Sequence, residues 1–281
     1  MQTLYVSDLD GTLLRSDQKT SDYTNGVINT LSEKGVYFSY ATARSFHTAR
    51  KVTKGMEAHF PLIVYNGAFI VENGTGRILQ AVYFQKEEAS EILSALLGQG
   101  VQPIVYSVKD GKEQMRYIRR RLHPEAAAFM DTRKGDLRDT PAEDEGQLMQ
   151  GDVFYFTCIE EADKLEPLYE AFRQKYRCVY ARDIYSDAQW LEIMPKEASK
   201  ANAIGRLKKM LGCEKVVAFG DGLNDVDMFE LADEAYAVEN AAPELKDKAT
   251  AVIGGNNEDG VAQYLAKRLN MEEQDGQSSV D

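Results

Sequence analysis

The chain has 281 residues, enough for one large domain or two of ordinary size, and its 43% apolar and 28% charged residues are typical of a folded soluble protein. The formal net charge of −12 argues against nucleic acid as a partner, because the phosphate backbone attracts basic surfaces. No apolar run approaches the roughly 20 residues of a membrane span, and no signal peptide is recognisable, so we expect a cytoplasmic protein that does not bind membranes.

The first third of the chain alternates short apolar runs with segments of helical periodicity. Each apolar run stands near the front of its unit, which predicts a parallel sheet covered by helices. The predicted strands are residues 4–6, 36–41 and 62–65, and the predicted helices are residues 22–34 and 45–55.

The same pattern returns at the carboxyl-terminal end, whereas the middle of the chain differs. The final segment predicts helices at residues 199–211, 225–231 and 260–269 and strands at residues 215–219 and 235–238, followed by a frayed acidic tail at 271–281. The middle predicts strands at 81–84, 101–108, 152–159 and 178–180, helices at 87–97 and 160–175, and a charged stretch without clear period at 131–150. We therefore predict an α/β protein: a Rossmann-like parallel-sheet core, residues 1–81 and 187–281, with an inserted α+β domain, residues 82–186.

Two carboxylates directly follow the first predicted strand. Asp8 and Asp10 stand two residues apart and are followed by Gly11. In an open parallel sheet, ligands bind outside the carboxyl ends of the strands. Two neighbouring acids repel each other unless a cation or a proton relieves the repulsion, and a hard cation with oxygen ligands such as Mg²⁺ does so. Taken alone, the segment is more typical of a turn, since aspartate and glycine are common turn formers.

Polar residues also follow two other predicted strands of the core. Thr42 comes after the second strand, and Asp221 stands between two glycines after the strand at residues 215–219. Lys200 lies near the start of a predicted helix, where the helix dipole disfavours a cation, so its position makes sense if it meets an anion. The repetition favours a site for metal and phosphate over an isolated turn.

These motifs, in this order, resemble those of the haloacid dehalogenase superfamily. Residues 8–14 (DLDGTLL) resemble its first motif, Thr42 the second, Lys200 the third, and residues 220–225 (GDGLND) the fourth. The long insertion between the second and third motifs resembles the cap domain of the Cof-type hydrolases, as does Asn66-Gly67-Ala68 just before it. The second motif departs from the usual Thr-Gly-Arg, since Ala43 stands before Arg44, and Ala201 replaces the glycine that often follows the lysine.

The resemblance implies a division of roles among these residues. Asp8 would be the nucleophile that forms an aspartyl phosphate, and Asp10 the general acid and base. Mg²⁺ would be held by Asp8, the backbone carbonyl of Asp10 and Asp221. The phosphoryl oxygens would be contacted by Thr42, Lys200 and Asn224, with supporting roles for Asp225, Gly11 and Arg44.

The implied activity is that of a phosphoric monoester hydrolase acting on a small phosphate ester, either a sugar phosphate or a phosphorylated cofactor. Two alternatives stay open on the same residues. A phosphotransferase or phosphomutase would pass the phosphoryl group to another hydroxyl, and a metal-binding regulatory protein would not turn over at all. The sequence leaves the particular substrate and the oligomeric state undetermined.

Overall fold

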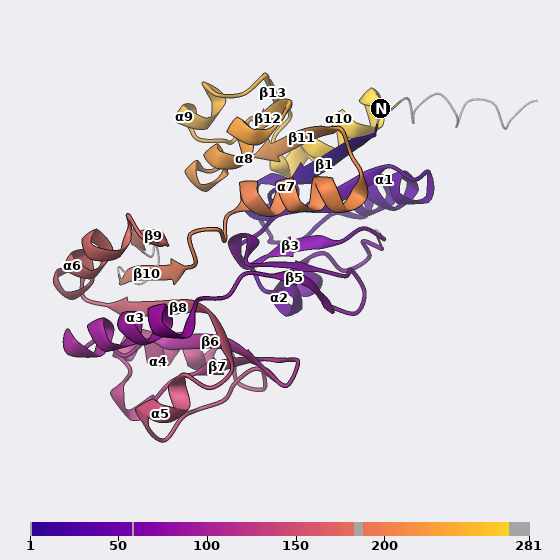
Figure 1. Ribbon diagram of the computed structural model, residues 1–281. Coiled ribbons are helices and arrows are strands. Elements are labelled where there is room, and N and C mark those ends of the chain that lie inside the picture. Colours follow the sequence, from indigo (N-terminus) through magenta and orange to yellow (C-terminus); the bar gives the residue numbers. More distant parts are fainter. Residues whose placement is uncertain (1, 58, 183–187, 270–281) are drawn as a thin grey trace, which may run out of the picture. The chain divides into compact units, whose positions relative to one another are not determined.

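The computed structural model describes residues 2–57, 59–182 and 188–269, in which the chain divides into two compact units (Figure 1). We call Met1–Ala81 together with Ser199–Asp281 the core unit, and Val82–Ala198 the inserted unit. The tail predicted to fray, residues 271–281, lies outside the described residues.

The core unit is built on a parallel five-stranded sheet, which confirms the predicted fold class. Its strand order is β13-β12-β11-β1-β2. Strand β1 runs between β11 and β2, and its apolar side chains Leu4 and Val6 are fully buried, because a parallel strand of this kind is covered on both faces. The strands are β1 (Thr3–Ser7), β2 (Tyr37–Tyr40), β11 (Lys215–Gly220), β12 (Glu234–Val238) and β13 (Ala251–Ile253).

The helices of the core unit start at serine caps at three places. The hydroxyls of Ser21, Ser45 and Ser199 accept hydrogen bonds from backbone N–H groups three residues ahead, which satisfies donors that a helix start leaves unpaired. Helix α1 packs against α10, and α7 packs against α8. The helices are α1 (Asp22–Glu33), α2 (Phe46–Val52), α7 (Lys200–Leu211), α8 (Val226–Leu231), α9 (Pro243–Lys246) and α10 (Gly260–Arg268).

A small antiparallel sheet, β3-β4-β5, completes the core unit. It comprises β3 (Leu62–Val64), β4 (Phe69–Val71) and β5 (Ile78–Ala81), and a parallel bridge joins Ala41 to Ile63. The predicted strand at residues 81–84 was therefore placed too late, because the chain pairs with β4 only up to Ala81.

The inserted unit has an antiparallel sheet of order β7-β6-β8-β10-β9 and its own apolar core. That core includes Ile92 and Leu165 from the helices and Val105, Phe156 and Leu191 from the sheet. The strands are β6 (Ile104–Lys109), β7 (Lys112–Arg116), β8 (Asp152–Glu160), β9 (Arg177–Arg182) and β10 (Gln189–Met194); the helices are α3 (Lys86–Gly98), α4 (Pro124–Asp131), α5 (Glu145–Leu148) and α6 (Ala162–Phe172).

The inserted unit ends later than the sequence pattern indicates. It extends to Ala198, not to residue 186, because β10 pairs antiparallel with both β8 and β9. Trp190 on β10 packs edge-on against Phe129 of α4, with ring centroids 4.9 Å apart, and so contributes to the packing of this unit.

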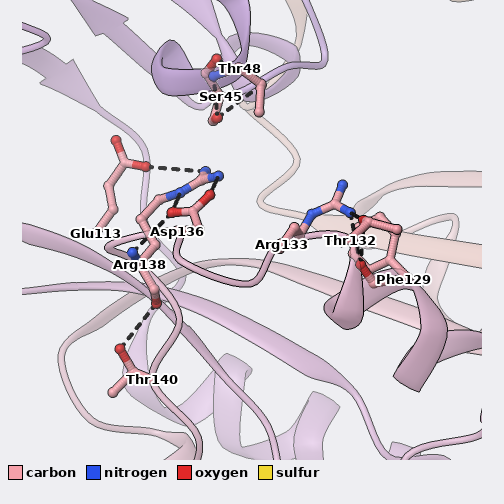
Figure 2. A network of polar contacts seen from close by, with 9 residues as sticks. All are labelled: Ser45, Thr48, Glu113, Phe129, Thr132, Arg133, Asp136, Arg138 and Thr140. Atoms are coloured by element: carbon pink, nitrogen blue, oxygen red, sulfur yellow. Dashed lines mark hydrogen bonds and ion pairs between the residues drawn. The ribbon is translucent and has the colours of Figure 1, made fainter.

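Polar contacts organise the first half of the charged stretch at residues 131–150 (Figure 2). The guanidinium of Arg138, although buried, donates to both carboxylate oxygens of Asp136 at 2.9 and 2.6 Å. A carboxylate oxygen of Glu113 lies 3.7 Å from the same guanidinium, and the Arg138 carbonyl accepts from the Thr140 hydroxyl. Throughout the part of the chain that the structure describes, no helix is long and apolar enough to cross a membrane.

Candidate active site

Three strands of the core sheet deliver the predicted site residues to one edge. Ser7, the last residue of β1, lies opposite Phe219 of β11 and Tyr40 of β2. The N–H of Asp8 donates to the carbonyl of Phe219 at 2.9 Å, and the N–H of Ala41 donates to the carbonyl of Ser7 at 2.9 Å. The sheet therefore brings Asp8, Thr42 and Asp221, which follow these three strands, to the same edge.

Lys200 joins this edge from the first turn of α7. Its ammonium donates to Asp8 Oδ1 at 2.5 Å and to Asp225 Oδ1 at 2.7 Å, and all three side chains are buried. Although burial alone would lower it, the pKa of Lys200 is raised by the charges of Asp8 and Asp225. The two carboxylates thus offset both desolvation and the unfavourable helix dipole at this position.

Asp225 acts on Lys200 and on the loop that carries Asp221. While Oδ1 accepts from Lys200, Oδ2 accepts from the backbone N–H groups of Asp221 at 3.1 Å and Gly222 at 3.2 Å. Its side chain is fully buried. Both oxygens are therefore committed to holding the ammonium and the loop in place.

The acids at this edge form a group whose negative charge exceeds the positive charge beside it. Carboxylate oxygens of Asp8, Asp221 and Asp225 lie within 4.8 Å of one another, and Lys200 contacts only Asp8 and Asp225 among them. Burial, followed by the charge of Asp225 and then Asp221, raises the pKa of Asp8 despite the proximity of Lys200. Burial also raises the pKa of Asp221. A hard divalent cation with oxygen ligands fits this set and would relieve the repulsion.

Gly11 and Thr12 shape the same cluster from the turn Leu9–Leu13. A Cβ atom at Gly11, whose φ is +77°, would lie 2.4 Å from Asp221 Oδ2, so only glycine leaves room for that carboxylate. The hydroxyl of Thr12 donates to Asp221 Oδ1 at 2.7 Å. Thr12 lies within the first motif but is not among the predicted site residues.

Asn240 is a further residue that the sequence did not indicate. It follows β12, another parallel strand, and its side-chain N–H donates to the carbonyl of Gly11 at 2.7 Å. Its Oδ1 accepts from the N–H of Asn256 at 3.0 Å, so the amide links two loops across the sheet edge. The available signal was its place at the end of a parallel strand.

The remaining predicted residues are not part of this cluster of acids. The carboxylate of Asp10 is bound by Arg44, whose Nε and Nη2 donate to Oδ2 and Oδ1 at 2.8 and 2.6 Å. Thr42 is fully buried and its hydroxyl accepts from the N–H of Arg44 at 3.1 Å. Asn224 is exposed, on the turn Leu223–Asp225. The three acids that lie together are thus Asp8, Asp221 and Asp225, with the Asp10 side chain directed to Arg44.

Comparison with known protein families identifies the class of protein to which this fold and this cluster of acids belong. The family model of the haloacid dehalogenase-like hydrolases matches residues 5–265. The chain therefore belongs to that family, as the four motifs indicated. An X-ray structure of TM0651 from Thermotoga maritima superimposes with a TM-score of 0.77 and 26% identity, covering 95% of this chain and 97% of that one.

Among its relatives, several are named as phosphatases. A Bacillus subtilis protein named 5-amino-6-(5-phospho-D-ribitylamino)uracil phosphatase YwtE is 25% identical over 281 residues, covering 93% of this chain and 96% of its own. The B. subtilis stress response protein YhaX is 27% identical over 286 residues, covering 97% of this chain and 95% of its own. The chain is thus a haloacid dehalogenase-like hydrolase with phosphatases among its relatives.

Proposed function

We propose that this protein is a Mg²⁺-dependent phosphatase that hydrolyses a small phosphorylated metabolite through an aspartyl phosphate on Asp8. The observation that carries the proposal is the buried contact of Lys200 with Asp8 and Asp225 beside Asp221, at the carboxyl edge of a parallel sheet. A carboxylate is a competent nucleophile toward phosphorus, and phosphoryl transfer depends chiefly on positioning and charge stabilisation.

The proposed role of each residue is the one that the family's motifs imply. Asp8 attacks phosphorus, and the leaving alcohol takes its proton from Asp10, which then accepts a proton from the attacking water. Lys200, oriented by Asp225, neutralises charge at the phosphoryl group, which Thr42 and Asn224 also contact. Asp8, Asp221 and the carbonyl of Asp10 would hold Mg²⁺, which supplies charge neutralisation and orientation of the phosphate when bound.

The size of the insertion supports a small substrate. We propose that the inserted unit is a cap that excludes bulk water and reads the leaving group. Sugar phosphates and phosphorylated cofactors are the classes that such a protein would accept. The relative named for 5-amino-6-(5-phospho-D-ribitylamino)uracil adds that compound to those worth testing.

The test is phosphate release from a panel of sugar phosphates, pyridoxal phosphate, flavin mononucleotide and 5-amino-6-(5-phospho-D-ribitylamino)uracil, with Mg²⁺ and with chelator. We expect one class to be turned over only with Mg²⁺. Asp8→Asn should abolish turnover, whereas Asp247→Asn, which alters an exposed acid at the end of α9, should leave it unchanged. Turnover by folded Asp8→Asn at the wild-type rate would exclude the aspartyl phosphate.

Two other outcomes point to other functions. Product that forms only when a second sugar hydroxyl is present would indicate phosphotransfer. Failure of folded wild-type protein to release phosphate from any compound, with Mg²⁺ bound, would indicate a non-catalytic regulator.

A further inference from the structure

The side chain of Asp10 is held by a bidentate ion pair with Arg44. Nε and Nη2 of Arg44 donate separately to the two carboxylate oxygens, at 2.8 and 2.6 Å. The backbone of Arg44 is anchored on both sides, because its N–H donates to the Thr42 hydroxyl and its carbonyl accepts from the N–H of Tyr65. The guanidinium is therefore presented to Asp10 from a fixed piece of backbone.

This pair is incompatible with the role proposed for Asp10 as proton donor. Both of its oxygens accept hydrogen bonds from the Arg44 guanidinium, so neither oxygen is directed at a leaving group. A general acid needs a protonated oxygen directed at the leaving group. For Asp10 to donate a proton in the proposed reaction, its ion pair with Arg44 has to open first.

The two cation–carboxylate pairs of the site differ in how easily they exchange partners. The side chains of Lys200 and Asp8 are 2% and 7% exposed, whereas those of Arg44 and Asp10 are 22% and 48% exposed. An exposed ion pair is screened by water and contributes little, so a better partner displaces it readily. A phosphate group is such a partner, because the planar fork of arginine matches phosphate oxygens as well as carboxylate oxygens.

We propose that Arg44 exchanges partners when the substrate binds: it leaves Asp10, binds oxygens of the phosphate group, and so releases the Asp10 carboxyl for proton transfer. This inference rests on the proposed function and deepens it. Arg44 is then both a phosphate-binding residue and the residue that positions Asp10 before binding. Through this exchange, the Asp10 carboxyl is released from Arg44 only when a phosphate ester is bound.

The proposal makes Asp10 a competitor of phosphate for one guanidinium, which a double-mutant cycle detects. Binding of inorganic phosphate would be measured by calorimetry, with Mg²⁺ present, for wild type, Asp10→Asn, Arg44→Gln and the double variant. We expect Asp10→Asn to bind phosphate about tenfold more tightly and Arg44→Gln about tenfold more weakly, each step of ten being 1.4 kcal/mol. The gain from Asp10→Asn should disappear in the Arg44→Gln background.

That last comparison separates exchange from simple charge removal. If Asp10 only repelled the anion, Asp10→Asn would tighten binding equally in both backgrounds, and the proposal would be overturned. Arg44→Lys, which keeps the charge and loses the fork, should weaken binding and lose most of the coupling. It also serves as the test if Arg44→Gln does not fold.

Turnover supplies a second readout that a structural role would not reproduce. Arg44→Gln should raise KM about tenfold with kcat within about threefold of wild type, because ground-state binding is lost while Asp10 is left free. Arg50→Gln, an exposed arginine on α2 beside the Phe46 ring, should change neither constant. A lowered kcat at unchanged KM would overturn the exchange.

Failure of this inference is distinguishable from failure of the proposed function. Wild-type protein that turns over a phosphate ester but shows no coupling in the cycle would contradict only the role of Arg44. Wild-type protein that neither binds phosphate nor releases it from any ester would contradict the phosphatase assignment itself.

Discussion

Thr12 sets the orientation of one carboxylate in the cluster of Asp8, Asp221 and Asp225. Its buried hydroxyl donates to Asp221 Oδ1 at 2.7 Å, so Oδ2 is the oxygen that would bind Mg²⁺ in the proposed site. Partners of this kind orient a ligand without touching the metal, and their loss typically weakens metal affinity by about 10–100-fold.

We therefore predict that Thr12→Val raises the Mg²⁺ concentration needed for half-maximal activity by about tenfold or more. The activity at saturating Mg²⁺ should fall much less, because valine keeps the volume and removes only the hydroxyl. The measurement is initial rate against Mg²⁺ concentration. Thr12→Ser, which retains the hydroxyl, should stay close to wild type; an equal shift in both variants would show that packing, not the hydrogen bond, is what matters.

Among single residues, the sequence predicts those site residues that directly follow a strand, because that position places them at the carboxyl end of the sheet. Asp8, Thr42 and Asp221 each follow an apolar run, so the topology of a parallel sheet places them together. The partner of Asp10 was not predictable, because the contact with Arg44 depends on side-chain directions. Asn240 was missed for a related reason, since its contribution is a hydrogen bond to a carbonyl more than two hundred residues away in the chain.

Among the elements, the turn Tyr65–Gly67 is unusual in its backbone. Three successive residues have positive φ, at 51°, 53° and 94°. Residues other than glycine rarely adopt this conformation. A Cβ atom at Gly67 would lie 2.1 Å from the carbonyl oxygen of Ser199, the N-cap of α7. The turn therefore packs directly against the start of the helix that carries Lys200.

We predict that Gly67→Ala destabilises the protein by about 2–4 kcal/mol, because backbone strain adds to an overlap that only a backbone shift relieves. Activity should fall as well, since the shift moves the first turn of α7 and with it Lys200. Urea unfolding and phosphate release measure the two effects.

The matched control is Gly35→Ala, at a position with φ of +75° and nothing within 4 Å of the added atom. It carries the strain without the overlap and should cost about 1 kcal/mol with activity unchanged. Equal losses in the two variants would mean that strain alone accounts for the effect at Gly67.

Strands that lack an apolar run are the elements that the sequence did not predict. Strand β7 has the sequence Lys-Glu-Gln-Met-Arg and is fixed by the hairpin that Asp110-Gly111 forms with β6. Both turn residues have positive φ, and the Asp-Gly pair is a known hairpin signal, so this strand was predictable from its turn. Strand β13 has three half-exposed or exposed residues at the sheet edge, where no pattern marks it.

For the whole molecule, the sequence predicted an insertion but not its end. The boundary at residue 186 assumed that the chain returns to the core after β9. Strand β10 instead adds to the antiparallel sheet, and its buried Leu191 and Ile193 belong to the apolar core of the inserted unit. A buried strand has the same apolar sequence pattern in either sheet. Only its pairing therefore decides to which unit it belongs.

Because each unit has its own core, we predict that the two units unfold separately in the intact chain. Phe156 is fully buried in the inserted unit and Phe219 in the core sheet. Phe156→Ala should lower the stability of the inserted unit by about 3–5 kcal/mol and leave the core unit unchanged, and Phe219→Ala should do the reverse.

The single tryptophan makes these two transitions distinguishable. Trp190 lies on β10 against Phe129, so its fluorescence follows the inserted unit, whereas far-ultraviolet circular dichroism follows both. In urea, Phe156→Ala should move the fluorescence midpoint to lower denaturant while a second dichroism transition stays at its wild-type position. In Phe219→Ala the fluorescence midpoint should stay in place and the other transition should move. Coincident midpoints by both probes, shifted equally by either substitution, would instead require that the two cores unfold as one cooperative body.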